Sequence, residues 1–424
     1  MKNLFKSIVA FALALLARAV VRRYAPRIVM VTGSVGKTST KDAVAAVLAS
    51  RFYVRKSEKS FNSEFGVPFT ILGVGNPWQD PLAWLAIVRS AVALLVLPNH
   101  YPTLLVLETG ADKPGDLARI LRIATPDAVV VTRLPEISVH VEAYASPEAV
   151  REEEFSPAYA LSAGAPLIVP ADDPYALENA LRTPSRVISY GSAASASVRL
   201  SDTGFYTEDG KVVGMRAQMH MKDVQEELVV SGSVGATQLL PVAAALAAAL
   251  AFEIPVSEAL TALKRYEPPA GRGRLLAGKS GSIIIDDSYN ASPAAVEEAL
   301  ATLKAFPNAK RRVAVLGDML ELGRYSVMEH ERISTLAGES ADLIITVGIR
   351  ARAFAGARGN TEVASFDNAR AVALELPALV RAGDVILVKG SQSIRTERIV
   401  EALLADPADV SKLVRQEKAW KRRA

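Results

Sequence analysis

A short glycine-containing loop near the start of the chain offers the clearest chemistry in the sequence. It follows the apolar run 28–31, precedes a helical stretch, and consists of Gly33, Ser34, Val35, Gly36, Lys37, Thr38 and Ser39. Backbone N–H groups in such a loop bind phosphate together with the positive end of the following helix dipole. Lys37 would reach the outer phosphates, and the Thr38 hydroxyl would hold Mg²⁺. The first glycine lies closer to the lysine than in a full Walker A motif, so chance agreement is the alternative, but the flanking strand and helix favour phosphate binding.

Acidic residues and a histidine follow other apolar runs in this half of the chain. Glu108 ends the run 104–107, and ligands of open α/β sheets gather at such strand ends. A carboxylate there suits Mg²⁺, although a glutamate that caps the next helix is the alternative. His140 follows the run 128–131, but a lone histidine is more often a surface or core residue than a ligand. The acidic run 152–154 would, by itself, form a solvated helix face.

Polar residues also follow three apolar runs in the second half of the chain. The segments are 286–293 (Asp-Asp-Ser-Tyr-Asn-Ala-Ser-Pro), 316–323 (Leu-Gly-Asp-Met-Leu-Glu-Leu-Gly) and 389–391 (Lys-Gly-Ser). Paired aspartates and an asparagine at a strand end suit contacts with a ribose, a base or a metal. Because several successive strand ends are polar, they predict a site more strongly than any one of them alone.

Together these segments resemble the Mur ligase family, and the resemblance extends from about Arg27 to the end of the chain. The glycine loop resembles the family's shortened P-loop, and 62–68 resembles its substrate loop. Segments 108–111 and 140–142 resemble its metal-site segments. Three further segments are similar to the member that adds D-alanyl-D-alanine to a UDP-muramoyl tripeptide, namely Gly271-Arg272, 287–293 and 316–323.

The resemblance implies an ATP-dependent ligase that activates a carboxylate as an acyl phosphate and couples it to an amine in peptidoglycan precursor synthesis. ATP and Mg²⁺ are the implied cofactors, and a muropeptide precursor and D-alanyl-D-alanine are the implied substrates. The residues implied to bind ATP are Gly33, Ser34, Gly36, Lys37, Thr38, Ser39, Arg272, Asn290 and Asp318. Those implied to hold Mg²⁺ are Thr38, Glu108, His140 and Glu154. Catalytic roles are implied for Lys37, His140 and Lys389, and substrate contacts for Asn62, Ser63 and Glu64.

Three departures from the family pattern bear on function. The family usually begins with a separate UDP-binding domain, whereas about 25 residues precede the first expected strand here. Thr237 stands where the family often has histidine, and Glu154 stands where it has a lysine that becomes carbamylated. Glu154 would supply a permanent carboxylate to the metal site, or would simply be one of three solvated acids. The rival functions are a ligase of this type with a different or lipid-linked acceptor, and a non-catalytic nucleotide-binding homologue.

The elements that position these residues are predicted from apolar runs that alternate with helical stretches, a pattern of βαβ units and mostly parallel sheets. We expect an α/β protein with a hydrophobic helix over 1–25, a central P-loop-type ATP-binding domain over 26–268 and a Rossmann-like domain over 269–424. Shorter alternating segments within 185–230 predict antiparallel strands that decorate the central domain. The last domain should hold four strands, at 283–285, 313–316, 343–347 and 385–388.

Composition narrows the setting in which the protein works. The 424 residues include no cysteine, which excludes disulfides and thiolate chemistry and fits a reducing cytosol. The net charge of +4 arises largely in a basic tail. We interpret this tail as a solvated helix end, and contact with an anionic membrane surface is the alternative. We expect no nucleic-acid partner, because no nucleic-acid motif accompanies the charge. The tail cations are Lys412, Arg415, Lys418, Lys421, Arg422 and Arg423.

The apolar run 8–17 is short for a bilayer span, which needs about 20 residues. A helix packed on the core, an interfacial anchor and a tilted span are the options, in that order. A second apolar block, 82–97, has helical length, and together with the run 8–17 and the basic tail it leaves peripheral membrane contact open. The expected location is the cytoplasm or the inner face of the membrane.

Overall fold

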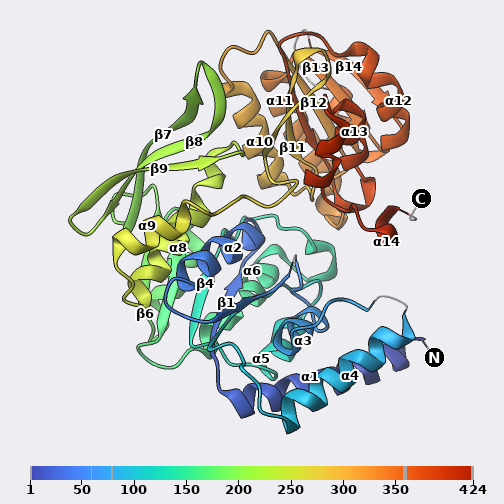
Figure 1. Ribbon diagram of the computed structural model, residues 1–424. Helices are drawn as coiled ribbons and strands as arrows, with labels where there is room; N and C mark the ends of the chain where they lie inside the picture. The colour runs from blue at the N-terminus through green and yellow to red at the C-terminus, as the bar shows by residue number, and fades with distance from the viewer. Residues whose placement is uncertain (1, 59, 78–79, 357–360, 422–424) are drawn as a thin grey trace.

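Two twisted sheets with helices on both faces make up the protein in the computed structural model, which describes residues 2–58, 60–77, 80–356 and 361–421 (Figure 1). The central sheet has the strand order β2-β3-β1-β4-β5-β6-β7-β8-β9, and the second sheet has the order β10-β11-β15-β12-β13-β14. The α/β class expected from the sequence is confirmed.

Neighbouring strands of the central sheet pair in parallel from β2 through β7. Its strands are β1 (Arg27–Thr32), β2 (Val54–Lys56), β3 (Leu104–Glu108), β4 (Ala128–Val131), β5 (Pro166–Pro170), β6 (Arg186–Gly191), β7 (Val198–Glu208), β8 (Lys211–Met221) and β9 (Val224–Ser231). Every residue of β3 and β4 is buried, as a parallel strand covered on both faces requires. Along β1, Val29 and Val31 join the core on one face, while Ile28 and Met30 join the core on the other.

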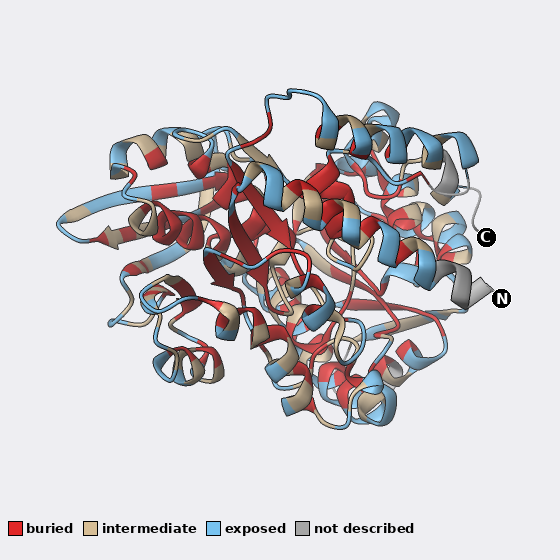
Figure 2. Ribbon diagram, turned by 90° about the horizontal axis from the view of Figure 1, so that it is seen from below, coloured by how far each residue is buried: buried red, intermediate tan, exposed pale blue. Residues whose placement is uncertain are grey.

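Helices cover both faces of this sheet (Figure 2). On one face lie α2 (Lys37–Leu48), the alanine-rich α8 (Leu240–Ala251) and α9 (Val256–Leu263). On the other face lie α1 (Lys2–Tyr24), α3 (Gly66–Leu72), α4 (Pro81–Val96), α5 (Asp116–Leu121) and α7 (Pro174–Leu181). The short α6 (Pro147–Phe155) carries the acidic run.

The expectation for 185–230 is partly wrong. We predicted antiparallel strands there, but β6 pairs with β5 in parallel register. The reason is the connection, since α7 crosses back between β5 and β6 as in a βαβ unit. β7 also pairs with β6 in parallel, and antiparallel pairing is limited to β7 with β8 and β8 with β9, which extend the same sheet.

The second sheet holds the four predicted strands at its centre, β11 (Ile283–Asp287), β12 (Arg311–Gly317), β13 (Leu343–Val347) and β15 (Asp384–Lys389). The edge strands β10 (Arg274–Ala277) and β14 (Glu362–Phe366) were not predicted, because neither is buried enough to show a continuous apolar run. One face is covered by α10 (Pro293–Ala305) and α11 (Ser326–Ser340), and the other by α12 (Ala369–Leu379) and α13 (Glu397–Leu403). The short α14 (Lys418–Lys421) ends the described chain.

The N-terminal helix packs on the core, which confirms the first of the three options for it. Leu13, Ala17 and Val20 of α1 are buried in the cluster that also holds residues of α3 and α4. No helix in the described part of the chain is both long and apolar enough to cross a membrane.

Candidate active site

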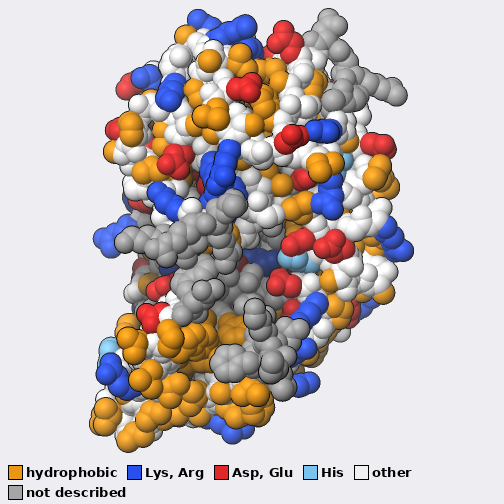
Figure 3. Space-filling view, turned by 90° about the vertical axis from the view of Figure 1, so that its right-hand side faces the viewer, with side chains coloured by type: hydrophobic (Ala, Val, Ile, Leu, Met, Phe, Trp, Pro, Cys, Tyr) orange, Lys and Arg blue, Asp and Glu red, His pale blue; other side chains and the backbone are white. Residues whose placement is uncertain are grey.

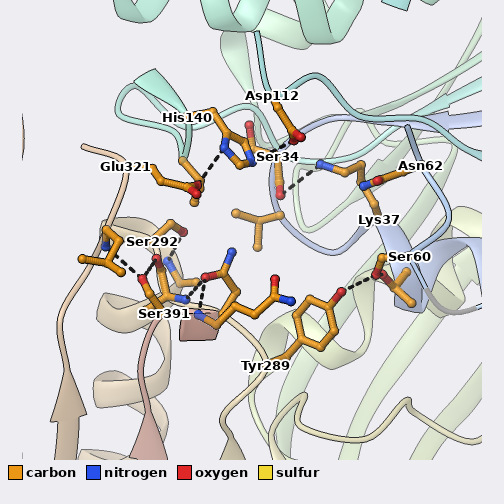
Figure 4. A pocket seen from close by; sticks show the side chains of 18 of the residues that line it. Ser34, Lys37, Ser60, Asn62, Asp112, His140, Tyr289, Ser292, Glu321 and Ser391 are labelled. Atoms are coloured by element: carbon orange, nitrogen blue, oxygen red, sulfur yellow. Dashed lines mark hydrogen bonds and ion pairs between the residues drawn. The ribbon is translucent and has the colours of Figure 1, made fainter. Parts of the chain in front are cut away.

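A cavity of about 650 Å³ lies between the two domains, where strand ends of the central sheet face strand ends of the second sheet (Figure 4). Eleven of the predicted site residues line it: Ser34, Gly36, Lys37, Thr38, Asn62, Ser63, Glu108, His140, Glu154, Arg272 and Asn290. These residues come from seven separate stretches of sequence, so the fold gathers them at one place.

Five predicted residues lie outside this cavity. Ser39 and Lys389 line a second, smaller cavity of about 60 Å³, together with Arg272 and Thr237. Glu64 forms an ion pair with Arg119 at 3.5 Å, and Gly33 lies at the base of the glycine loop. The carboxylate of buried Asp318 accepts a hydrogen bond from the backbone N–H of Ala351 at 2.7 Å, an intradomain contact.

The glycine loop joins buried β1 to the first turn of α2. Gly33 has φ 111°, and a Cβ at this position would collide with Thr132, so the turn requires glycine. Gly36 is the N-cap of α2, so no capping side chain accepts the first N–H groups of the helix. The Lys37 side chain folds back over the loop, where its Nζ donates to the carbonyl oxygen of Gly33. Free helical N–H groups beside a lysine make a site for phosphate.

A buried carboxylate and a hydroxyl lie beside this loop. Thr38 Oγ1 donates to Glu108 Oε1 at 3.2 Å and lies 3.1 Å from Ser60 Oγ. Burial raises the pKa of Glu108, and the nearby Lys41 ammonium, 3.8 Å away, opposes this shift. The second oxygen, Oε2, is buried without a hydrogen-bond partner. A hydroxyl and an incompletely satisfied carboxylate are hard oxygen donors, so the pair fits Mg²⁺.

The metal ligands expected from the sequence do not form one cluster. Within the described residues, no three histidine or acidic side chains lie close enough together to hold a metal ion by themselves. An ion beside Thr38 and Glu108 would therefore draw its remaining ligands from phosphate oxygens and water, as Mg²⁺ commonly does.

His140 links the two domains. Its Nδ1 lies 2.7 Å from Glu321 Oε2 of the second domain, and its Nε2 lies 3.5 Å from Asp112 Oδ1 (Figure 4). Burial lowers the pKa of His140, but the hydrogen bond and charge of Glu321 outweigh it, so the net shift is upward. The same hydrogen bond lowers the pKa of Glu321.

The three acids of α6 do not share one solvated face, so that interpretation holds for exposed Glu152 but is wrong for half-buried Glu153 and buried Glu154. Glu152 accepts hydrogen bonds from two tyrosine hydroxyls, and Glu153 accepts the N–H groups of Gly115 and Leu117 at the start of α5. Glu154 is buried, accepts a hydrogen bond from Ser34 Oγ, and places Oε1 3.7 Å from Lys37 Nζ. Each acid has its own partners because successive helical residues point in different directions.

The second domain closes the cavity with residues of the 286–293 segment. The guanidinium of Arg272 lies over the Tyr289 ring at 4.1 Å, and the Tyr289 hydroxyl donates to Ser60 Oγ of the central domain at 2.6 Å. Lys389 is buried, and its Nζ donates to Asp287 Oδ2 at 2.6 Å and to the carbonyl oxygen of Asn290 at 3.0 Å. Burial lowers the pKa of Lys389. Lys389 thus braces the loop that carries Asn290.

Sequence reasoning missed several lining residues, among them Ser60, Asp112, Arg395 and Trp420. The interpretation of the basic tail as a solvated helix end holds for exposed Lys412 but is wrong for Arg415. Arg415 is buried and pairs with Glu397 at 3.0 Å. This ion pair holds the C-terminal segment against the second domain, and Trp420 lines the cavity. In the sequence, the one feature that could have indicated a site in the tail is Trp420, a lone tryptophan among cations.

A phosphate-binding loop on a parallel sheet, facing a second α/β domain across a polar cavity, is the arrangement of a nucleotide-dependent enzyme with two closing domains. Residues 31–249 match the Mur ligase middle domain, and residues 271–392 match the Mur ligase, glutamate ligase domain. The chain belongs to the Mur ligase family and is an ATP-dependent ligase that forms an amide bond.

Similar proteins cover most of the chain. The UDP-N-acetylmuramoyl-tripeptide–D-alanyl-D-alanine ligase of Bacillus subtilis is 28% identical over 401 residues, which are 93% of this chain and 80% of that protein. The ligase of the same name from Mycobacterium tuberculosis H37Rv is 30% identical over 426 residues, 93% of this chain and 77% of that protein.

Among solved structures, the MurF ligase of Thermotoga maritima in complex with ADP has a TM-score of 0.76 at 26% identity, over 93% of this chain and 83% of that one. Mycobacterium tuberculosis folylpolyglutamate synthase complexed with ADP, at 14% identity, shares the fold with a TM-score of 0.63 over 92% of this chain and 94% of that one.

Proposed function

We propose that this ligase adds D-alanyl-D-alanine to a UDP-muramoyl tripeptide during the synthesis of peptidoglycan precursors. The observation that carries the proposal is the similarity, over about nine-tenths of the chain, to ligases named for that reaction. The cavity supports it, because the glycine loop, the 62–63 segment and the second-domain strand ends all open into one space.

The chemistry divides between the two domains. The substrate carboxylate attacks the γ-phosphorus of ATP, which releases ADP and leaves an acyl phosphate. Lys37 and the first N–H groups of α2 stabilise the charge on the transferred phosphoryl group. The amine of the dipeptide then attacks the acyl carbon, phosphate leaves, and the amine loses a proton. Contacts between the domains, such as Tyr289 to Ser60, would hold the cavity closed against water during this second step.

Thr38 and Glu108 would hold Mg²⁺ in this proposal. When bound, the ion neutralises charge on the outer phosphates. His140 and Glu154 would be ligands of a second Mg²⁺. His140 would then have to leave Glu321 and bind the ion, and Lys37 would have to turn from Glu154 to the phosphates. Arg272 and Asn290 would contact the nucleotide from the second domain, with Asp318 near its ribose or phosphates, and Lys389 would position the loop around Asn290.

Substrate contacts are proposed for Asn62 and Ser63, which line the cavity, and for Glu64, which follows them and pairs with Arg119. We place the reaction in the cytoplasm, where ATP is available and cysteine-free chains need no oxidising environment. The contact with the inner face of the membrane that the sequence left open would be made by the apolar runs of α1 and α4, away from the active-site cavity.

The test is ADP release measured with each substrate omitted in turn. Full-length protein should release ADP only when ATP, a muramoyl tripeptide and D-alanyl-D-alanine are all present, and mass spectrometry should find the pentapeptide product. A panel of UDP-linked and lipid-linked tripeptides identifies the acceptor, and turnover of lipid-linked substrate alone would replace UDP-muramoyl tripeptide as the substrate. Nucleotide binding without ADP release on any acceptor would instead favour a non-catalytic homologue.

A further inference from the structure

The outer sides of α1 and α4 form an exposed apolar surface at one end of the molecule. We call it the α1/α4 face and define it by Ile8, Phe11, Leu15, Leu82, Leu85, Val88, Val92 and Val96, whose exposed fractions run from 47% to 77%. Figure 3 shows hydrophobic side chains gathered at the end of the molecule where Figure 1 places these helices. Of the eighteen large hydrophobic residues exposed in the described chain, these eight and the adjoining Leu97 make up half. Exposed apolar residues on soluble proteins are usually scattered, so this concentration marks a binding surface.

Helical spacing shows that both helices are apolar on two sides. On α4, Ile87, Ala91 and Leu94 face the core, while Leu85 and Val92 lie on the opposite side. A surface helix that only covers a core has polar residues on its outer side. The second apolar side of each helix therefore has no function in the fold of the chain itself.

The two helices lie side by side and run in the same direction (Figure 1). At their C-terminal ends the Tyr24 hydroxyl donates to the carbonyl oxygen of Leu94 at 2.7 Å, and the Tyr24 ring stacks on Tyr101 at 4.5 Å. Arg23 also donates to the carbonyl oxygen of Leu95. These contacts hold the two outer sides in one surface.

All charges on these helices have the same sign. The 23 residues of α1 and the 16 residues of α4 include no aspartate or glutamate. The outer line of α1 continues from Leu15 to Arg18 and Arg22, both exposed, and Arg89 is exposed among the apolar residues of α4. An apolar surface that carries only cations complements a surface whose interior is apolar and whose boundary is anionic.

We propose that the α1/α4 face binds an anionic lipid bilayer, with both helices lying in the plane of the interface. The apolar side chains would enter the boundary between headgroups and acyl chains, and the arginines would contact lipid phosphates. A second copy of the chain fits less well, because a symmetric contact would place Arg18, Arg22 and Arg89 against like charges without an acid on either helix. This docking would also bring the active site near the membrane, since α3, which packs on α1, directly follows the loop of Asn62 and Ser63.

The test is flotation of the full chain with two kinds of vesicle. One contains phosphatidylcholine alone, and in the other about three-tenths of the lipid is anionic phosphatidylglycerol. The wild-type protein should float with the anionic vesicles, and high salt should release most of it. Leu82→Glu combined with Leu85→Glu should weaken binding on the order of a hundredfold, because two apolar contacts are lost and two like charges are added. Replacing Arg18 and Arg22 by glutamine should weaken it by roughly fivefold per cation.

A matched control changes equally exposed apolar residues elsewhere. Leu374→Glu combined with Val327→Glu alters residues that are 83% and 69% exposed on α12 and α11, and this variant should float as the wild type does. Unchanged ADP release and melting temperature would show that the α1/α4 variants are folded. The proposal is overturned if the wild type does not float, if it floats equally with neutral vesicles, or if the α1/α4 and control variants behave alike. A dimer in solution that only the α1/α4 variants dissociate would overturn it in favour of self-association. Flotation does not depend on catalysis, so failure of the ligase assay leaves its result intact.

Discussion

Glu154→Gln tests whether the permanent carboxylate beside the glycine loop serves the metal and the phosphates. Glutamine keeps the size of the side chain and an oxygen that accepts from Ser34, so the substitution removes mainly the negative charge. Oε1 of Glu154 lies 3.7 Å from Lys37 Nζ, and both side chains are largely buried. We expect Lys37 to be released toward nucleotide phosphates and any cation near Glu154 to lose a ligand.

The magnitude follows from this separation. Two unit charges 3.7 Å apart attract by about 4.5 kcal/mol at an effective dielectric constant of about 20. The cost of desolvating both charges offsets most of that attraction, which leaves on the order of 1–2 kcal/mol, or roughly a tenfold change in an equilibrium constant. ATP should therefore bind about tenfold more tightly to Glu154→Gln in the absence of Mg²⁺. The Mg²⁺ concentration for half-maximal ADP release should rise by about tenfold.

Calorimetric titration of ATP without metal gives the first quantity, and a Mg²⁺ titration of ADP release gives the second. Glu152→Gln is the matched control, because this acid lies on the same helix but accepts hydrogen bonds from tyrosines outside the cavity. Wild-type activity should also be the same in carbonate-free and bicarbonate-containing buffers, because Glu154 needs no carbamylation. If both titrations of Glu154→Gln match the wild type, the carboxylate has no part in phosphate or metal binding.

Three further predictions concern the site and its support. Lys37→Ala should lower ADP release at least a hundredfold in a protein that still folds, since the side chain serves phosphate charge; near-normal turnover would contradict the assignment. Tyr289→Phe removes the hydroxyl that bonds Ser60 across the domains, at a cost of about 1 kcal/mol, so the KM for ATP should rise several-fold in steady-state assays while an unchanged KM would refute a closing role. Burial raises the pKa of Asp286 to about 6 from an ordinary value of 3.8, so the folded state binds the proton more tightly and stability falls as pH rises between these values. In urea unfolding, the free energy of unfolding of Asp286→Asn should rise relative to that of the wild type by up to about 3 kcal/mol between pH 4 and 7. If the difference between the two proteins is the same at both pH values, burial does not raise the pKa of Asp286.

The glycine loop was predictable because its chemistry is local. A buried strand, two glycines, a lysine and a threonine within a few residues determine both the turn and the phosphate-binding N–H groups. The four central strands of the second sheet were predictable for a similar reason, since strands buried on both faces are continuous apolar runs. The edge strands β10 and β14 lack that signal because water covers part of them.

Pairings between distant residues were not predictable in the same way. No spacing in the sequence brings His140 to Glu321 or the hydroxyl of Tyr289 to Ser60, because these contacts depend on how two domains meet. The acids of α6 show the same limit, since three identical neighbours acquire three different environments from the elements packed around them.

By itself, the sequence determined the α/β class, the phosphate-binding loop and the polar strand ends, because each depends on residues within one segment and on the hydrophobic period of that segment. The tertiary structure alone decided which of those residues share a cavity and that buried Lys389 bonds the loop that carries Asn290. It also decided that the apolar runs at 8–17 and 82–97 become neighbours with a common exposed side. The physical reason is that burial and charge pairing arise between segments far apart in the chain, and only folding brings such segments into contact.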